Sequence, residues 1–460
     1  MSAPSGPVPG PFRNARYTPL AADGPLPWDM VRAVPAIRRS PVDFLTRTAA
    51  RYGGAVAFPL PRTPVLLLTD PAAVRRVLVE NARNYGRATL QYKALATVTG
   101  QGLLTSDGAP WRTHRRIVQP AFHHSALDGI AEQAVAAARR LRRTTDPGPR
   151  GTEVEVAEAT ARATLEVIGR TLAEADLRGV AEQLVDAVGR ALELVVARAQ
   201  SPVPGTWPTP SRRRLRAAVA EIDAVCARIV AVRRAATVAE DATDLVGLML
   251  RAGSGDEEIR DELVTFVVAG HETVASCLTW TLDLLARHPA EQAALHAELA
   301  DVLGAPGESR EPTWDDLARL PRTRAVLDEA LRLYPPAWVI TRTSLAPDTV
   351  AGVDVPAGTL VIVCTWALHR DPELWPEPET FRPERFLGAP RREVGYVPFG
   401  AGPRLCIGRD LALVEAVLVL AALLRDRRVR PGTGPRPRVE SLVTLRPAGG
   451  LRLRFETLPG

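Results

Sequence analysis

The sequence predicts a mainly α-helical protein with a minor β region, built as a single large domain around one long central helix. Segments rich in Ala, Leu, Val and Arg, with apolar residues at helical spacing, fill most of residues 127–246. No proline interrupts residues 254–288, which predicts a helix of about 30 residues, roughly 45 Å long at 1.5 Å per residue. Short apolar runs within 55–69 and 337–364 suit strands.

The composition indicates a globular protein from a reducing compartment. The chain has 460 residues, and its hydrophobic content of 46% is enough for a large core. The four cysteines lie far apart and lack C-x-x-C spacing, which argues against a disulfide framework or a zinc site. Lys93 is the one lysine among 58 basic residues, so we attribute the net charge of +6 to arginine-rich genome composition and expect no nucleic-acid binding.

The N-terminus carries no targeting signal that we can identify. Residues 1–27 are rich in Pro, Gly, Ala and Ser, and we expect this segment to be extended or flexible. It lacks the apolar core of a signal peptide and any 18-residue apolar run. We therefore expect a soluble, cytoplasmic protein without a membrane anchor, whose folded domain comprises residues 28–460.

Helix and strand signals alternate in the first quarter of the chain. Residues 41–52 suit a short helix, and the apolar runs 55–60 and 64–69 suit a hairpin. Pro71 after Asp70 marks the start of another helix. Residues 82–104 mix polar, aromatic and apolar types, and we expect either a lid over a pocket or an ordinary packed connection.

The segment W-R-T-H-R-R begins at Trp111. Trp111 and Arg115 are four residues apart, so they share a helix face, where the indole and the guanidinium could donate to one carboxylate. Taken alone, Trp111 suits a core position, and Arg115 with Arg116 suits a solvated face.

The central helix contains the sequence A-G-H-E-T at residues 269–273. Ser254 and Glu257 suggest a capping box at its start. Gly270 costs about 1 kcal/mol relative to Ala inside a helix, so it suggests a close approach by a flat cofactor or by a crossing helix. Thr273 can bond to the carbonyl one turn earlier and loosen the helix, making room for dioxygen and water. Glu272 beside it can relay protons.

A later helix carries an acid–base pair and ends at two prolines. Glu329 and Arg332 lie three residues apart among apolar neighbours, so burial of the pair is plausible. A buried pair requires further hydrogen bonds, and Arg385 in F-R-P-E-R-F is a candidate partner. Residues 337–364 then suit a small sheet.

The stretch from Tyr396 to Asp410 holds the strongest local pattern, F-G-x-G-x-R-x-C-x-G. Its glycines permit tight turns and close backbone approach. The apolar run that follows predicts a buried helix, which places Cys406 at a helix N-terminus, where a thiolate is stabilised. A thiolate beside Arg404 suits an iron ligand, whereas an isolated cysteine here would more simply be a buried free thiol.

Together, these motifs resemble the cytochrome P-450 family from about Ala55 to the C-terminus. The resemblance implies that family's fold, with the central helix over haem b and Cys406 as the axial ligand of the iron. It also implies oxygen chemistry at Thr273 and Glu272 and a structural triad of Glu329, Arg332 and Arg385. The further haem contacts it implies are Trp111, Arg115, Ala269, Arg342, Phe399, Gly400, Arg404 and Gly408. The pocket it implies is apolar and is lined by Val268, Ala269, Ala337, Val339 and Val443.

The expected activity is insertion of one oxygen atom of O2 into a C–H bond or double bond of a lipophilic molecule. We expect a bacterial secondary metabolite, such as a terpenoid or polyketide, or a fatty acid. Because 54 residues follow Cys406, we expect no reductase domain; NAD(P)H would supply electrons through a ferredoxin and its reductase, docking near Arg404 and Arg409. The alternatives are a peroxide-using or isomerising haem-thiolate enzyme and a non-catalytic haem electron carrier or sensor.

Overall fold

The computed structural model describes residues 20–60, 63–146, 152–173, 178–199, 209–236, 244–388 and 395–459. Most of the predicted flexible segment 1–27 and of the proline-rich stretch 201–210 therefore lies outside the described residues. The prediction of a mainly helical fold with a minor β region is confirmed.

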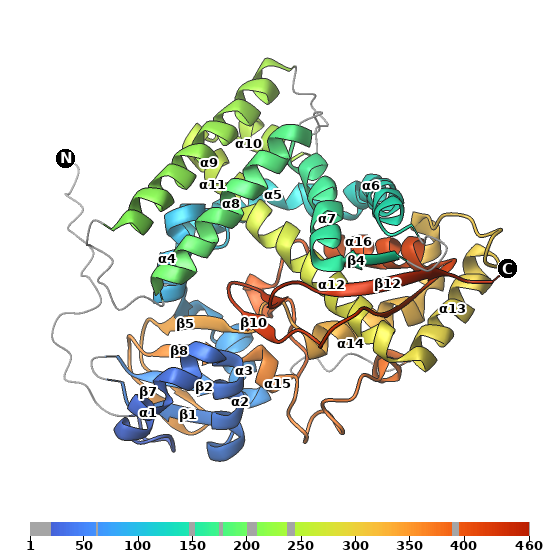
Figure 1. The fold of residues 1–460 in the computed structure, drawn as a ribbon. Helices are drawn as coiled ribbons and strands as arrows, with labels where there is room; N and C mark the ends of the chain where they lie inside the picture. The colour runs from blue at the N-terminus through green and yellow to red at the C-terminus, as the bar shows by residue number, and fades with distance from the viewer. Residues whose placement is uncertain are drawn as a thin grey trace.

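A five-stranded sheet forms one side of the molecule, at the lower left of Figure 1. The predicted hairpin 55–69 provides its first two strands. The second of these, β2, pairs in parallel with β8, a strand from the last third of the chain. The strands, in spatial order, are β1 (Ala55–Phe58), β2 (Val65–Leu68), β8 (Leu360–Val363), β5 (Ile340–Ser344) and β3 (Tyr85–Gly86). The accompanying helices are α1 (Pro27–Arg39), α2 (Pro41–Tyr52) and α3 (Pro71–Arg75), the last capped by Asp70 as predicted.

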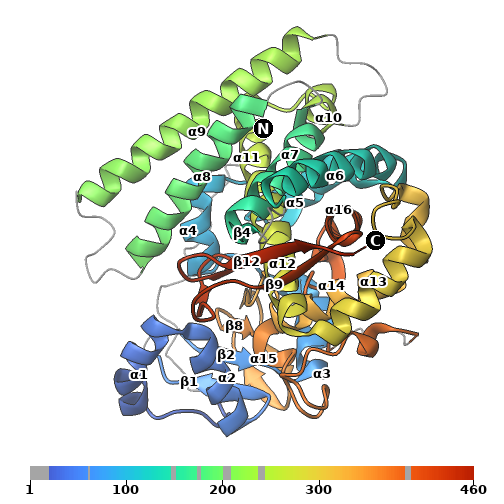
Figure 2. The same ribbon diagram turned by 45° about the vertical axis from the view of Figure 1, so that its right-hand side comes forward.

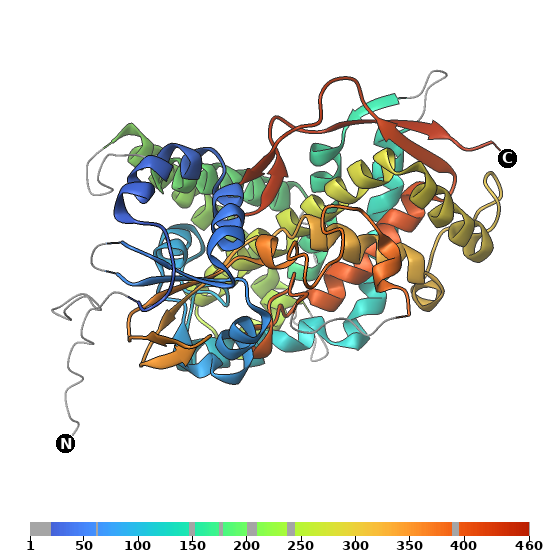
Figure 3. The ribbon, with the colours of Figure 1, turned by 90° about the horizontal axis from the view of Figure 1, so that it is seen from below.

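Helices make up most of the remainder, and in the view from below in Figure 3 the blue and orange strands of the sheet lie on the left, with the red C-terminal strands toward the right. In Figure 2, α8 and α9 run side by side. The helices are α4 (Leu90–Thr99), α5 (Gly108–Val118), α6 (His124–Thr144), α7 (Val156–Ala173), α8 (Arg178–Ala199), α9 (Pro210–Ala235), α10 (Leu245–Arg251), α13 (Pro289–Leu303), α14 (Pro321–Leu333), α15 (Thr365–Leu368) and α16 (Arg409–Leu424). The smaller strands are β4 (Thr152–Glu155), β6 (Asp348–Val350), β7 (Val353–Val355), β9 (Arg427–Pro431), β10 (Val439–Ser441), β11 (Leu445–Pro447) and β12 (Arg452–Thr457).

The predicted long helix is present and comprises 32 residues, Asp256–Arg287. It consists of α11 (Asp256–Phe266), a π-helical turn (Val267–His271) and α12 (Glu272–Arg287). Its N-cap is Gly255, whose N–H donates to Glu258, so the capping box lies one residue later than the sequence suggested. By length and composition the helix could span a membrane, but 72% of its most apolar window is buried inside the protein, as in a core helix.

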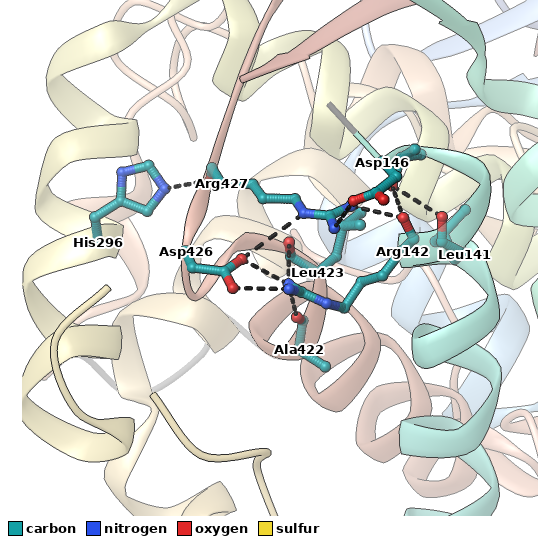
Figure 4. Close-up of polar contacts among 9 residues, drawn as sticks. Leu141, Arg142, Asp146, His296, Ala422, Leu423, Asp426 and Arg427 are labelled. Carbon is teal, nitrogen blue, oxygen red and sulfur yellow. Dashed lines mark hydrogen bonds and ion pairs between the residues drawn. The ribbon is translucent and has the colours of Figure 1, made fainter. Parts of the chain in front are cut away.

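The helix α16 lies at the centre of the core, and from Leu411 to Leu424 all its residues are buried except Ala412. Arg142 on α6 holds its C-terminal end. The guanidinium donates to the carbonyls of Ala422 and Leu423 and to both carboxylate oxygens of Asp426, at 2.7 to 3.3 Å (Figure 4). These bonds satisfy carbonyls that a helix end leaves unpaired. The fixed helix then positions the loop that precedes its other end.

Candidate functional site

The loop before α16 requires glycine at two places. Gly400 and Gly402 have φ angles of 72° and 66°, which other residues rarely adopt. A Cβ on Gly402 would lie 2.1 Å from the carbonyl oxygen of Leu78, so the backbone passes too close for any side chain. The Cys406 N–H donates to the Phe399 carbonyl at 3.0 Å and closes the loop. The result is a rigid turn that presents Cys406 just before α16, whose N-cap is Gly408.

Cys406 differs from the other three cysteines of the chain. Cys226, Cys277 and Cys364 are buried, whereas Cys406 has accessible surface. Burial nevertheless raises the pKa of the Cys406 thiol, so the sulfur lies deep within the protein while remaining open to a small group. The Gly408 N–H and then Arg115 and Arg409 lower that pKa, but less than burial raises it. The loop alone therefore does not favour a thiolate, contrary to the prediction, because burial outweighs the backbone donor and the two arginines; a bound cation would have to stabilise the thiolate.

The helix α5 lies against this loop and contributes the predicted Trp111 and Arg115. Arg115 donates from Nη1 to the Leu405 carbonyl at 3.1 Å. The guanidinium carbon of Arg404 lies 3.9 Å from the centroid of the Trp111 ring, a cation–π contact. Arg404 therefore points into the protein, where it also bonds to Asp107. The expectation that Arg404 faces a docking partner is wrong, because its charge is used inside the molecule.

Four arginines gather beside the loop, and we call Arg87, Arg115, Arg342 and Arg404 the arginine cluster. Arg87 and Arg342 are buried, and Arg404 is largely so. Burial is the main cause that lowers the pKa of Arg404, to about 9. The charges of Arg87 and Arg342 lower it further, and the charge of Asp107 opposes them. Burial likewise lowers the pKa values of Arg87 and Arg115. Because a guanidinium stays protonated in practice, the lowered values indicate that the cluster lacks compensating negative charge.

Unpaired atoms in the arginine cluster support that conclusion. Arg87 Nε and Arg404 Nη1 are buried and have no hydrogen-bond partner among the described residues. Asp107 faces the cluster and accepts hydrogen bonds from Arg404 and from the Arg87 N–H. One carboxylate against four guanidiniums leaves an excess of buried positive charge. Haem carries two propionates and an iron that binds thiolate, so the donors near Cys406 fit it.

Sequence reasoning missed three members of this site. Arg87, Tyr92 and Asp107 lie in or beside the segment described only as a lid or connection. Tyr92 is close to Arg87 and Arg342. Burial is the largest single influence on the pKa of Tyr92 and raises it, but the arginine charges together outweigh burial and lower the pKa. No spacing rule connects residues 87, 92 and 107 with residues 342 and 404, so only the folded chain brings them together.

The predicted loosening of the central helix is present at Thr273. Its hydroxyl donates to the Ala269 carbonyl at 2.6 Å, and the π turn lies directly before Glu272. Gly270 has a different role from the cofactor approach we considered. A Cβ there would lie 2.4 Å from Cδ1 of Ile168, so the glycine admits the neighbouring helix α7. The helix-crossing alternative therefore holds for Gly270.

Glu272 points into a cavity of about 280 Å³ between α7, α8, the central helix and the β10–β11 turn. The residues of the central helix that line the cavity include Val268, Glu272, Ala275 and Thr279. They are three or four positions apart and so lie on one face of the helix, whereas Ala269 and Thr273 lie on another. Burial raises the pKa of Glu272, while Thr444 and Arg446 oppose the shift. The acid and the alcohol thus lie on different sides of the helix, and no hydrogen bond joins them among the described contacts.

The five predicted pocket residues fall into two groups. Val268 and Val443 line the cavity beside Glu272. Ala269, Ala337 and Val339 do not, although all three keep accessible surface. Val443 is at the turn between β10 and β11, and the adjacent Leu442 carbonyl accepts from Trp338 Nε1 at 3.0 Å. That bond holds the turn against the residues that lead into β5.

The predicted scaffold residues lie together. Arg332 donates to both carboxylate oxygens of Glu329, at 2.7 and 2.8 Å, and both side chains are 0% exposed. Arg332 also donates to the carbonyls of His369, Pro378 and Thr380, which supplies the further bonds a buried pair requires. Arg385 Nε lies 3.4 Å from Glu329 and completes the group. The contacts join α14 to the segment that leads toward the Cys406 loop.

Comparisons with known proteins identify the family of this chain. A model of the cytochrome P450 family matches residues 23–455. The chain is 36% identical over 433 residues to cyclooctatin synthase of Streptomyces melanosporofaciens, covering 90% of this chain and 91% of that protein. It is 35% identical over 415 residues to cyclooctat-9-en-7-ol 5-monooxygenase of the same organism, covering 87% of each.

Two solved structures share the fold. CYP175A1 from Thermus thermophilus is 31% identical with a TM-score of 0.77, covering 93% of this chain and 97% of that one. The cytochrome P450DA heme domain is 29% identical with a TM-score of 0.81, covering 91% and 94%. The chain therefore belongs to the cytochrome P450 family and is a monooxygenase, and its family implies a haem-thiolate cofactor.

Proposed function

We propose that this monooxygenase hydroxylates or epoxidises a lipophilic terpenoid of bacterial secondary metabolism, using O2 and haem b. The observation that carries the proposal is the π turn before Glu272, with the Thr273 hydroxyl bonded to the Ala269 carbonyl. The turn is followed directly by Glu272, an acid with a raised pKa, and then by Thr273, an alcohol. An enzyme that consumes O2 needs such groups, whereas one that rearranges a hydroperoxide needs no external proton supply.

The overall reaction fixes what the protein must provide. One oxygen atom enters a C–H bond or double bond of the substrate, and the other leaves as water after accepting two protons and two electrons. The bound haem would supply the activation of O2, with Cys406 as the thiolate ligand. The chain's own task is then to orient the substrate, exclude bulk water and deliver the two protons.

Proton delivery follows from the positions of Glu272 and Thr273. Glu272 lines a cavity whose other wall includes Glu193 and Arg446, with side chains 64% and 39% exposed. Its raised pKa lets the carboxyl hold a proton more readily than an exposed glutamate. The oxygen of Thr273, whose hydrogen goes to Ala269, can accept a hydrogen bond on the other side of the helix. We infer that protons enter through the cavity and pass from Glu272 toward the Thr273 side.

The substrate class rests on the apolar pocket residues and on the relatives. None of the five predicted pocket residues carries a charge, neither Val268 and Val443 in the cavity nor Ala269, Ala337 and Val339 outside it, which suits a hydrocarbon skeleton. One relative is named for oxidising cyclooctat-9-en-7-ol, a carbon skeleton with a double bond and a hydroxyl. We extend that substrate class to this chain.

The proposed electron source is a ferredoxin that is reduced by NAD(P)H through its reductase. Bacterial relatives imply an external redox partner for this chain. Arg112 and Arg116 on α5 are exposed, and Arg409 is 42% exposed beside Asp410. These cations lie on or next to the Cys406 loop, because Arg115 of the same helix bonds to Leu405. An acidic partner would be attracted to this face. We place the complex in the cytoplasm.

One reconstitution tests the proposal. Purified protein with haem, a bacterial ferredoxin, its reductase and NADPH is titrated spectrally with a terpenoid library, and bound compounds are incubated under ¹⁸O2. We expect one ¹⁸O atom in the product. The ferrous carbon monoxide complex should show the red-shifted Soret band of a thiolate ligand, which Cys406→His should lose. The matched controls Cys226→Ser, Cys277→Ser and Cys364→Ser should keep it. Product formation from peroxide alone, with none from O2, would overturn the proposal.

A further inference from the structure

The cavity beside Glu272 lies on a different face of the central helix from Thr273, where the oxygen chemistry is proposed. Ala157 and Ala161 of α7 line one side of it, and the turn between β10 and β11 lines another. Helix α8 contributes six residues with the spacing of a single helix face, namely Val185, Val188, Gly189, Leu192, Glu193 and Val196. The cavity is therefore a separate compartment behind the central helix.

The lining of this cavity is apolar apart from one end. Most of the side chains in the wall are Ala, Val or Leu. Among the polar ones, the hydroxyls of Ser276 and Thr279 and Nε2 of His271 each already donate to a backbone carbonyl. Arg446 Nη1 and Glu193 Oε1 lie 3.6 Å apart and partly exposed, as a pair at the rim. These groups have partners of their own and need none from a ligand.

The polar end of the cavity is formed by Glu272 and Thr444. Thr444 is 4% exposed, and its hydroxyl has no hydrogen-bond partner among the described residues. Leaving a buried hydroxyl unpaired is costly, so such a group calls for a partner. Thr444 lies close enough to Glu272 to influence the pKa of that carboxyl. One hydroxyl placed between them could accept from Thr444 and donate to Glu272.

Gly189 forms part of the cavity mouth. It is exposed in the interior of α8, where glycine lowers helix stability relative to alanine. A Cβ at this position would meet no atom within 4 Å, so packing does not require a glycine. The missing side chain leaves an opening on the face of α8 that lines the cavity. A molecule could therefore enter from the surface at this point.

We propose that this cavity binds a lipophilic alcohol of about ten carbon atoms, whose hydroxyl lies between Glu272 and Thr444, and that the bound alcohol slows proton supply. The second part rests on the proton route of the proposed function. A dry apolar cavity of about 150 Å³ can hold benzene, and about 280 Å³ in proportion holds roughly ten carbons. The apolar wall favours a hydrocarbon body over water. That body excludes water from Glu272, so protons reach the carboxyl more slowly.

A titration that needs no turnover tests the site. The holoprotein is first saturated with econazole, whose imidazole ligates the iron and whose rings fill the haem side. Geraniol and myrcene, which share one ten-carbon skeleton, are then titrated by calorimetry. We expect one geraniol to bind per protein, with myrcene about fivefold weaker because it lacks the hydroxyl. Failure of geraniol to bind, or equal affinities of the two compounds, would overturn the site.

Two variants test where the alcohol lies. Thr444→Val keeps the shape of the side chain and should weaken geraniol about fivefold while leaving myrcene unchanged. Gly189→Leu closes the mouth and should weaken both compounds at least about tenfold. Its matched control is Gly129→Leu, because Gly129 on α6 is also exposed and open within 4 Å but does not line the cavity. Wild-type affinity of Thr444→Val for geraniol would overturn the polar end, and wild-type affinity of Gly189→Leu would overturn the mouth.

Turnover tests the effect on proton supply. With O2, the redox partner and a terpenoid substrate present, geraniol should raise the hydrogen peroxide formed per NADPH in the wild type and in Gly129→Leu. It should have no such effect in Gly189→Leu. Binding of geraniol without a rise in peroxide would overturn the slowing of proton supply. Absence of any product from O2 would contradict the proposed function, whereas absence of geraniol binding to the econazole complex would contradict the cavity site alone.

Discussion

His114 and Glu262 form a buried pair that ties α5 to α11, with His114 Nδ1 2.9 Å from Glu262 Oε1. The side chains are 10% and 0% exposed. The helix α5 also carries Trp111 and Arg115, so this pair fixes the wall of the arginine cluster against the central helix. His114 lies one position off the face of Trp111 and Arg115, and no local pattern in the sequence pairs it with Glu262, 148 positions later.

We expect this pair to make stability depend on pH. The hydrogen bond to Glu262 is the main cause that raises the pKa of His114, against burial, and Glu258 at 3.8 Å from Nε2 adds to it. A group with a raised folded-state pKa contributes stability that is complete below its unfolded pKa of about 6.5 and is lost as pH rises through the folded value. His114→Gln should therefore destabilise the protein more at pH 6 than at pH 9, measured by denaturant unfolding.

The size of that effect follows from the burial of Glu262. Removing one member of a buried pair costs about 3–5 kcal/mol, because the other charge is left uncompensated. The double variant His114→Gln with Glu262→Gln should recover much of this loss. A loss for His114→Gln that is equal at pH 6 and pH 9 would show that the imidazole acts by packing alone.

We expect Thr273→Ala to uncouple oxygen consumption from product formation. Ala is at least as good a helix former as Thr, so the spectrum and the haem content should be unchanged. Loss of assistance by a positioned proton donor is typically worth about 10²–10⁴-fold. NADPH consumption should continue, with more hydrogen peroxide and less product. Thr273→Ser keeps the hydroxyl and should restore coupling. Wild-type coupling in Thr273→Ala would exclude this hydroxyl from the relay.

Glu272→Gln should slow product formation while leaving its ratio to peroxide less affected. The amide keeps the shape of the side chain but cannot supply a proton from the cavity. If Glu272 carries the proton, proton transfer limits turnover more strongly in the variant, so the solvent deuterium isotope effect should be larger in the variant than in wild type. Glu193→Gln at the exposed wall of the cavity is the milder comparison. Unchanged turnover in Glu272→Gln would place proton entry elsewhere.

Arg332→Gln should prevent stable folding or haem retention, because Glu329 would remain charged without its bidentate partner. The expected loss is about 3–5 kcal/mol. Arg385→Gln should cost less, since its contact with Glu329 is 3.4 Å and single. Arg319, whose side chain is 54% exposed, provides the control Arg319→Gln, expected to cost about 1 kcal/mol or less. Thermal unfolding monitored at the Soret band and by circular dichroism measures all three. An equal cost for Arg332→Gln and Arg319→Gln would contradict the scaffold role.

Docking of the electron donor should weaken with salt. Arg112→Gln and Arg116→Gln remove exposed cations from α5 without touching Trp111 or Arg115. Electrostatic attraction at such a face acts mainly on the association rate and is screened by salt. The rate of reduction by ferredoxin should therefore fall with ionic strength, and the decline should be shallower in the variants. A rate that does not change with salt would argue against an electrostatic dock.

The sequence by itself determined the features that depend on neighbouring residues. The hairpin 55–69, the cap at Asp70, the length of the helix 256–287 and the back-bond of Thr273 follow from spacing, prolines and local hydrogen bonding. The Cys406 loop also follows from local sequence, because Gly400 and Gly402 adopt positive φ angles that favour glycine. These features can be predicted without knowledge of the rest of the chain, because the interacting atoms belong to residues only a few positions apart.

The tertiary structure alone decided where charges and contacts converge. Arg87 and Arg342 come from segments 255 positions apart in sequence, and no local pattern shows that they share one buried site. Arg404 faces Asp107 and Trp111 instead of a partner, and Gly270 serves α7 instead of the cofactor. The cost of burying a charge or a Cβ depends on every segment that surrounds it. That cost is set only when the whole chain has folded.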